Sequence, residues 1–250
     1  MALIFKKGDP SNCGNYRPIS LLCMGYKIIV SILLRRLKAG GAESKIWNTQ
    51  FGFKSKSGTF DALFLLRRVL EDVWSEKDGS AVFVALDWAK AFDCISPEGL
   101  IDALRRFGLP RPFLEFIKNA YTHRQFFVED MAKQSEYRAQ FHGISQGCPL
   151  SPFLFVMLVT VIMHDATGKM QDSFGDILNA PFNVHDLIYA DDMLLIDRSS
   201  ESVPKYMDVV ISIGVEYVLE ISLVLDVNQK CKIRAASPSS KKTRSNILEL

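Results

Sequence analysis

The stretch Leu187-Ile188-Tyr189-Ala190-Asp191-Asp192-Met193-Leu194-Leu195-Ile196 places two adjacent carboxylates between two short apolar runs. Such runs around an acidic pair predict two strands joined by a tight turn, because Asp tolerates turn geometry better than most residues. Two negative charges side by side at a strand tip repel each other unless a cation lies there. The stretch therefore indicates either a cation site or an ordinary exposed turn.

An earlier apolar segment repeats this arrangement. Residues 81–86 read as a buried strand that ends in Asp87. Three carboxylates at strand ends, Asp87, Asp191 and Asp192, suit a pair of Mg²⁺ ions, which prefer oxygen ligands and substrate phosphates. The two segments together favour a metal site.

Size and composition limit the class of protein. A chain of 250 residues can bury a core as one large domain or two subdomains, and its hydrophobic content of 48% is ordinary for a globular protein. The longest apolar run, residues 153–163, is shorter than the ~20 residues that span a bilayer, and the N-terminus lacks the residue order of a signal peptide. Five scattered cysteines without a CxxC pair favour reduced thiols and no zinc site. We expect an intracellular protein with no membrane partner, in the nucleus or the cytoplasm.

Charge is distributed unevenly along the chain. Residues 1–68 carry twelve Lys or Arg and three Asp or Glu, whereas the whole chain has a net charge of only +2. A basic first quarter and an acidic remainder fit a polyanion held at one end and metal at the other. Solvated helix faces would explain the same basic residues equally well.

Hydrophobic periodicity predicts alternating helices and strands. Helices are expected at residues 21–39, 59–74, 96–108, 113–121, 152–165 and 206–219. Strands are expected at residues 81–87, in a hairpin of 125–128 with 137–141, and in the acidic hairpin. This order predicts an α+β fold with helices on one face of a sheet, and the Ser- and Lys-rich end from residue 237 is expected to be disordered.

The loop at residues 143–152 lies between the two acidic segments. Its two glycines allow a close approach of backbone to a ligand, and its two prolines fix the chain before a helix. Gln146 offers a neutral amide that could contact a sugar, a base or a phosphate.

Taken in order, these segments resemble the reverse-transcriptase domain of non-LTR (LINE-like) retrotransposons. The resemblance covers about residues 4–220 and is carried by Lys6-Lys7-Gly8-Asp9-Pro10, Asn15-Tyr16-Arg17-Pro18-Ile19-Ser20, Gln50-Phe51-Gly52-Phe53 with Thr59 and Asp61, Leu86-Asp87-Trp88-Ala89-Lys90-Ala91-Phe92-Asp93, the 143–152 loop and Tyr189-Ala190-Asp191-Asp192. It implies an RNA-directed DNA polymerase of right-hand architecture, with fingers at 1–75, an antiparallel palm sheet packed on helices at 76–225, and a polar tail at 226–250.

The same resemblance implies roles for individual residues. Asp87, Asp191 and Asp192 would be catalytic and hold two Mg²⁺ ions, with an RNA template, a DNA primer and dNTPs as partners. Arg17 and a lysine, Lys7 or its neighbour Lys6, would contact the incoming triphosphate. Phe92 would exclude a ribose 2′-hydroxyl, and Gln146 with Gly147 would pack near the incoming nucleotide.

The sequence departs from the family pattern after the acidic hairpin. Val218 and Ser222 stand where the family has a glycine and an asparagine, and Lys230 supplies the following lysine only after an insertion. No segment after residue 225 reads as a thumb, so we expect a piece of a larger retrotransposon polyprotein. A catalytically silent nucleic-acid-binding remnant and a group II intron maturase-like protein remain alternatives.

Overall fold

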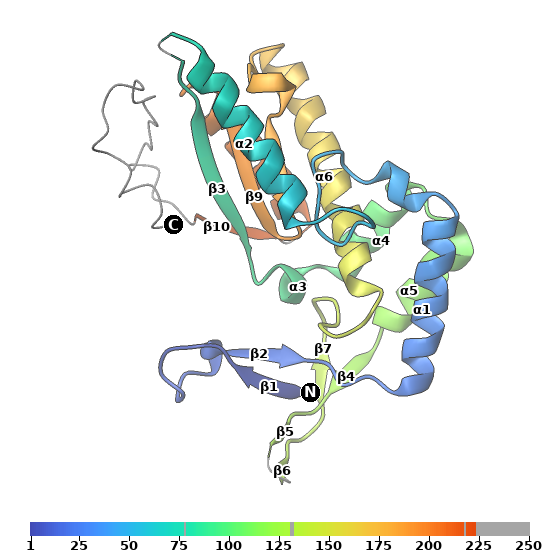
Figure 1. Ribbon diagram of the computed structural model, residues 1–250. Helices are drawn as coiled ribbons and strands as arrows, with labels where there is room; N and C mark the ends of the chain where they lie inside the picture. The colour runs from blue at the N-terminus through green and yellow to red at the C-terminus, as the bar shows by residue number, and fades with distance from the viewer. Residues whose placement is uncertain (78, 131–132, 218, 224–250) are drawn as a thin grey trace.

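The computed structural model describes residues 1–77, 79–130, 133–217 and 219–223. Within them, a four-stranded sheet with its helices forms the larger part, and short hairpins lie beyond one end of this sheet (Figure 1). The tail predicted at residues 226–250 lies outside the described residues, and so does Lys230.

The central sheet is antiparallel throughout and has the strand order β10-β3-β9-β8. Strand β3 spans Val82–Ala89, β8 spans Asp186–Tyr189, β9 spans Asp192–Asp197 and β10 spans Glu220–Leu223. The strand predicted at 81–87 and the acidic hairpin are both confirmed. Strand β10 was not predicted, and its register places Ser222 opposite Asp87.

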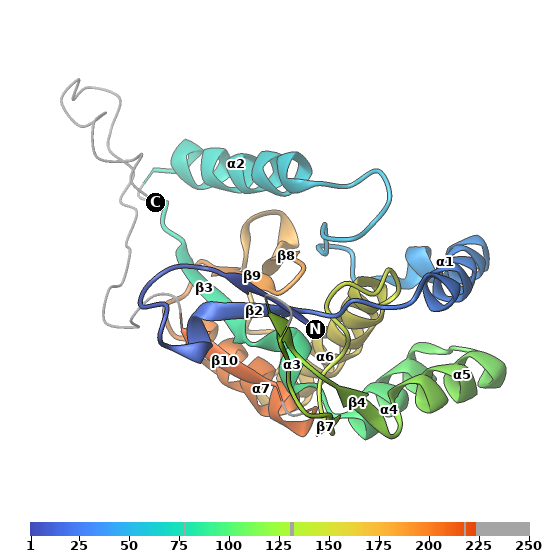
Figure 2. The same ribbon diagram turned by 90° about the horizontal axis from the view of Figure 1, so that it is seen from below.

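Helices cover both faces of this sheet, so the expectation of helices on one face was wrong. Figure 2 shows α2 (Thr59–Ser75) on one side of β3 and β9, and α7 (Ser202–Glu216) on the other. Val69 of α2 packs with Leu187 and Ile196 in a small core of its own. The cause lies in strands β8 and β9, whose apolar residues run continuously rather than alternating and therefore need cover on both sides.

Helix α6 (Ser151–Phe174) is the central helix of the larger core and is longer than predicted. It continues past residue 165 because Ala166 and Met170 keep its apolar face buried, and it ends at Gly175. Among the described residues it is the one helix long and apolar enough to cross a membrane, and 72% of its most apolar window is buried inside the protein. That burial is typical of a core helix in a globular fold.

The remaining elements surround this core. Helix α4 (Pro97–Phe107) begins at the Ser96 cap, which accepts a hydrogen bond from the Gly99 amide at 3.1 Å, and ends at Gly108 as predicted. The predicted hairpin is confirmed as β4 (Arg124–Phe126) with β7 (Arg138–Gln140). The other elements are β1 (Ala2–Phe5), β2 (Tyr16–Ile19), α1 (Met24–Ala39), α3 (Ala91–Cys94), α5 (Arg111–Tyr121), β5 (Glu129–Asp130), β6 (Lys133–Gln134), and the 3₁₀ turns η1 (Cys13–Asn15), η2 (Ala42–Lys45) and η3 (Pro181–Asn183).

A buried carboxylate joins three parts of the fold. Asp186 of β8 accepts hydrogen bonds from the Trp47 indole at 2.8 Å, the Thr49 hydroxyl and the Tyr206 hydroxyl at 3.2 Å. Burial raises the pKa of Asp186, because an ionised carboxylate loses its water shell there, and the three donors offset only part of this effect. Asp186 therefore fixes the loop before α2 and helix α7 onto the same strand.

The raised pKa of Asp186 predicts how stability changes with pH. As the pH rises above the ordinary value of 3.8, the unfolded chain releases this proton before the folded protein does, so the free energy of unfolding falls. Asp186→Asn keeps an acceptor for Trp47 and Thr49 and a donor for Tyr206. It removes the ionisable group and with it this pH-dependent contribution to the free energy of unfolding. Urea unfolding should show the variant gaining stability relative to the parent as the pH is raised from about 4 to 7, and a constant difference would contradict the assignment.

Candidate active site

The acidic turn joins β8 to β9 through two residues, Ala190 and Asp191, with Tyr189 paired to Asp192. The backbone of Ala190 is left-handed, with φ of 59°. Such a conformation is unfavourable for a residue with a Cβ, so the turn is held in place by contacts outside the hairpin.

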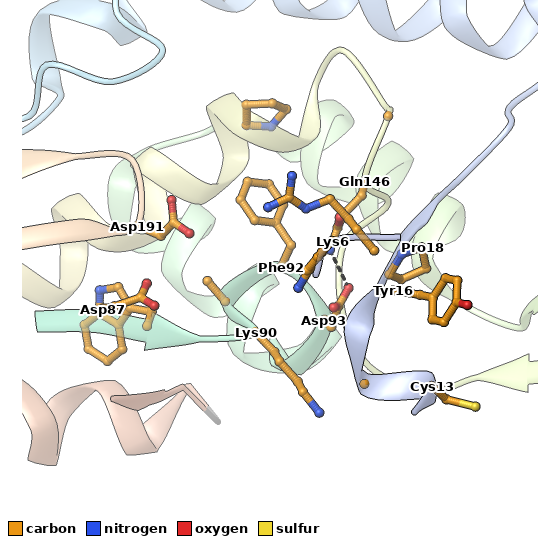
Figure 3. A pocket seen from close by; sticks show the side chains of 16 residues that line it. Lys6, Cys13, Tyr16, Pro18, Asp87, Lys90, Phe92, Asp93, Gln146 and Asp191 are labelled. Carbon is orange, nitrogen blue, oxygen red and sulfur yellow. Dashed lines mark hydrogen bonds between the residues drawn. The ribbon is translucent and has the colours of Figure 1, made fainter. Parts of the chain in front are cut away.

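Strand pairing brings the earlier carboxylate to this turn. Asp87 of β3 lies directly opposite Asp192 of β9, and opposite residues of an antiparallel pair project from the same face of the sheet. Asp191 and Asp87 both line one cleft, and Figure 3 shows their side chains together at one end of it. Burial and the negative charge of Asp191 both raise the pKa of Asp192. The structure thus gathers negative charge from two distant segments at one point.

Carboxylate oxygens are the donors that Mg²⁺ prefers, so the chemistry of this set fits that ion. Repulsion within the cluster also favours a bound cation. Among the described residues, however, no three His, Cys, Asp or Glu side chains stand close enough to form a ready metal site. Binding of two Mg²⁺ ions by Asp87, Asp191 and Asp192 stays a prediction.

The cleft at this turn has a volume of about 680 Å³. Four parts of the chain form its walls, namely the hairpin β1–β2, the segment from the end of β3 through α3, the loop before α6 with the start of that helix, and the acidic turn. Five of the predicted side chains besides Asp191 line it, together with the backbone of Gly147: Arg17, Asp87, Phe92, Gln146 and, of the two candidate lysines, Lys6. Lys7 and Asp192, although described, are not among the lining residues.

Phe92 stands in the wall next to the carboxylates. Its ring stacks on the buried ring of Phe155 in α6, with centroids 5.0 Å apart and an interplanar angle of 23°. This contact fixes the ring edge that faces the cleft. Phe92 therefore both packs against the core and lines the cleft.

Gln146 is fixed by two contacts in the wall of the cleft. Its side-chain Nε2 donates to the Asp93 carboxylate at 2.9 Å (Figure 3). Its backbone carbonyl accepts from the Ser20 amide at 2.7 Å. Burial raises the pKa of Asp93, and the Gln146 amide together with the charge of Lys6 opposes that shift. Gly147 follows with φ of 100°, and a Cβ at this residue would lie only 2.9 Å from the Ser20 carbonyl oxygen.

Charges of both signs line the cleft. Lys6, Arg17 and Lys90 are its cationic lining residues, and Asp87, Asp93 and Asp191 are its acidic ones. Neither Asp93 nor Lys90 was among the side chains that the sequence predicted for the site. Both lie in the Leu86–Asp93 motif, so the motif itself was the signal that they line the site.

Comparison with known proteins identifies the family. Residues 4–242 match the family described as "Reverse transcriptase (RNA-dependent DNA polymerase)". The chain belongs to the reverse-transcriptase family. This match, together with the mobile-element relatives described next, confirms the resemblance to the reverse-transcriptase domain of non-LTR retrotransposons.

Relatives of this reverse-transcriptase domain are proteins of mobile elements. It is 30% identical to the transposon TX1 uncharacterized 149 kDa protein of Xenopus laevis over 78% of the chain and 15% of that protein. It is 29% identical to the Pol polyprotein of the type-2 retrotransposable element R2DM of Drosophila melanogaster, over 70% and 16%, and 28% identical to the RNA-directed DNA polymerase from mobile element jockey of the same organism, over 79% and 21%. The chain thus spans less than a quarter of the length of these relatives.

Solved structures with the same fold include telomerases of Candida tropicalis. The apo enzyme truncated from its C-terminal domain has a TM-score of 0.53 at 11% identity, over 86% of this chain and 41% of that one. The enzyme in complex with a TWJ fragment of telomeric RNA has a TM-score of 0.54 at 12% identity, over 86% and 34%. At these identities the likeness shows the polymerase fold, while the boundaries of fingers and palm and the absence of a thumb stay predictions.

The loop glycine of this reverse-transcriptase domain gives a test of the site's geometry. Gly147→Ala would place a methyl group against the Ser20 carbonyl at a left-handed position, so we expect a loss of stability of about 1–3 kcal/mol. Gly168→Ala in α6 is the control, because its Cβ would meet no atom within 4 Å and helical alanine is favoured over glycine. Urea unfolding should move the two midpoints in opposite directions, and equal shifts would contradict the described loop.

Proposed function

We propose that this domain extends a DNA primer on an RNA template by transferring nucleotides from dNTPs to the primer 3′-hydroxyl. One observation carries this proposal: Asp87 and Asp191 line one end of a cleft that also holds cationic side chains, and the register of β3 with β9 sets Asp192 opposite Asp87. Family membership supports the reaction class.

The acidic end of the cleft would hold the metal. Two Mg²⁺ ions bound by Asp87, Asp191 and Asp192 would lower the pKa of the primer hydroxyl and stabilise the pyrophosphate leaving group. The three carboxylates orient the reacting groups through their fixed places on two paired strands and one turn. Catalysis by this chain would then depend on position and electrostatics.

The cationic side of the cleft would bind the triphosphate. Arg17 carries a planar guanidinium suited to phosphate oxygens, and it lines the cleft on the hairpin β1–β2. Lys6 lines the same cleft and is the better placed of the two candidate lysines. Lys7 would contact the triphosphate only if the hairpin β1–β2 changed its position.

The wall between these ends would select the sugar and position the base. The Phe92 ring is held in place by stacking on Phe155, so a ribose 2′-hydroxyl beside it would clash with a ring that cannot move aside. Gln146 and Gly147 lie on the neighbouring loop and would pack against the incoming nucleotide and the template base.

Template, primer and the remainder of the polymerase are part of the same proposal. Relatives several times longer than this chain support a domain that works within a larger retrotransposon polyprotein, where further segments would grip the duplex. Membership in a family described as RNA-dependent DNA polymerases supports an RNA template.

Primer extension tests the proposed reaction directly. Asp191→Asn removes one negative charge from the acidic end without changing side-chain size, so Mg²⁺-dependent extension on an RNA template with dNTPs should fall by about a hundredfold or more. Asp172→Asn, an exposed carboxylate on α6, is the matched control and should keep parental activity.

Full activity of the Asp191 variant would overturn the assignment of the acidic turn. If neither the parent nor the control extends a primer, while both bind primer–template tightly and in a salt-sensitive manner, the silent nucleic-acid-binding alternative is favoured instead.

Phe92 gives an independent test through selectivity. Phe92→Ala opens the wall beside the sugar, so the ratio of kcat/KM for dNTP over rNTP should fall by about tenfold or more. Phe155→Leu disturbs the same ring pair from the buried side and leaves the cleft wall in place. Unchanged selectivity in the Phe92 variant, or an equal loss in both, would remove Phe92 from this role.

A further inference from the structure

The Gln50-Phe51-Gly52 motif has no role in the proposed reaction, yet it lies directly against the acidic hairpin. Gln50 forms a parallel bridge with Ile188 of β8. The Phe51 amide donates to the Ile188 carbonyl at 2.9 Å, and the Ile188 amide donates to the Thr49 carbonyl at 2.9 Å. Residues 49–51 therefore follow the outer edge of the sheet next to β8.

The start of this segment is fixed to the core. Trp47 and Thr49 donate to the buried carboxylate of Asp186, as described above. The Trp47 amide also donates to the Thr160 hydroxyl of α6 at 3.1 Å. Gln50 is therefore presented to the hairpin from a backbone anchored on both a strand and a helix.

The Gln50 side chain is fully buried and contacts the acidic turn through its amide group. Its Oε1 accepts from the Ala190 amide at 3.0 Å and from the Gly52 amide at 2.7 Å. Its Nε2 donates to the Ala190 carbonyl over a longer distance, 3.4 Å. One side chain thus contacts both backbone polar groups of the residue that precedes Asp191.

Ala190 is the turn residue that needs such support. A two-residue hairpin turn favours a positive φ at its first central residue, but the Cβ of alanine makes that conformation unfavourable for Ala190. Gly52 allows the close contact, because a Cβ there would lie 2.4 Å from the Ala190 nitrogen. Gln50 and Gly52 of the motif therefore both lie against the backbone amide of Ala190.

We propose that Gln50 is a positioning residue that holds Ala190 in its left-handed conformation and so sets where Asp191 and Asp192 lie relative to Asp87. We call the hydrogen bonds that Gln50 forms with Ala190 and Gly52 the Gln50 clamp. These bonds are observed in the structure, whereas their effect on catalysis rests on the proposed polymerase function. Loss of the clamp leaves all three carboxylates in the protein and disperses them.

Two variants separate hydrogen bonding from packing. Gln50→Met keeps the volume and removes every hydrogen bond to the turn, whereas Gln50→Glu keeps an acceptor for the Ala190 and Gly52 amides. Ser202→Ala is the stability control, because it removes a buried hydrogen bond of 2.6 Å to Asp197 at the opposite end of β9. It affects the same strand without touching the turn.

The first measurement is hydrogen exchange of residues 187–193 by mass spectrometry, which needs neither metal nor activity. Exchange in this peptide should be about fivefold to tenfold faster in Gln50→Met, intermediate in Gln50→Glu and unchanged in Ser202→Ala. The second measurement is Mn²⁺ binding followed by electron paramagnetic resonance, where Gln50→Met should raise the Kd about tenfold or more.

Primer extension completes the test. Gln50→Met should lower kcat about tenfold or more, with the KM for dNTP little changed, because the nucleotide-binding wall is untouched. Unchanged exchange in Gln50→Met, or equal acceleration in Ser202→Ala, overturns the clamp. Faster exchange with parental Mn²⁺ affinity and kcat overturns the positioning role. A parent protein that shows the clamp but extends no primer contradicts the proposed function and leaves the clamp standing.

Discussion

The pairing of β3 with β9 is the constraint on which the rest of this structure depends. Its register places Asp87 opposite Asp192, two residues more than a hundred positions apart in the chain. A shift by one residue would turn every side chain of one strand to the other face and separate the carboxylates. Cores on both sides of the sheet prevent that shift, since Phe83 and Ile196 pack under α2 while Leu86 and Leu195 pack in the larger core. Hydrophobic packing thus fixes a cluster of charges that electrostatics alone would disperse.

Local signals made much of this fold predictable. The acidic hairpin, the strand ending in Asp87 and the Ser96 and Gly108 boundaries of α4 all follow from short-range preferences, and the structure has them. Long-range features were less accessible: β10 and the cover of the second sheet face depend on partners distant in sequence. In the site, Asp87, Asp191, Arg17, Phe92 and Gln146 line one cleft as their motifs indicated. The choice between Lys6 and Lys7 depended on the path of the chain in three dimensions. The motif that contains Gln50 did not indicate its role, because Gln50 bonds to the backbone of Ala190 and a backbone partner leaves no mark in the sequence.

Buried polar residues and the carboxylates of the cleft have different surroundings in this fold. Asp186, Gln50 and Ser202 are buried polar residues whose partners lie within the protein, and they fix loops onto the sheet. Asp87 and Asp191 line the open cleft beside cationic residues. Burial of a charge is far more unfavourable than burial of a hydrogen-bonded amide. Gln50 can therefore be fully buried, whereas Asp87 and Asp191 remain half-buried at the open cleft.

The segment that follows the outer edge of β8 has a consequence for the molecule in solution. An uncovered edge strand presents a row of amide and carbonyl groups that can pair with a strand of another molecule. Here the Thr49 carbonyl and the Phe51 amide already occupy the edge groups of Ile188. At Ile188, the middle residue of the apolar Leu187-Ile188-Tyr189 sequence, both backbone groups are thus bonded within the chain, where a strand of another molecule would otherwise pair.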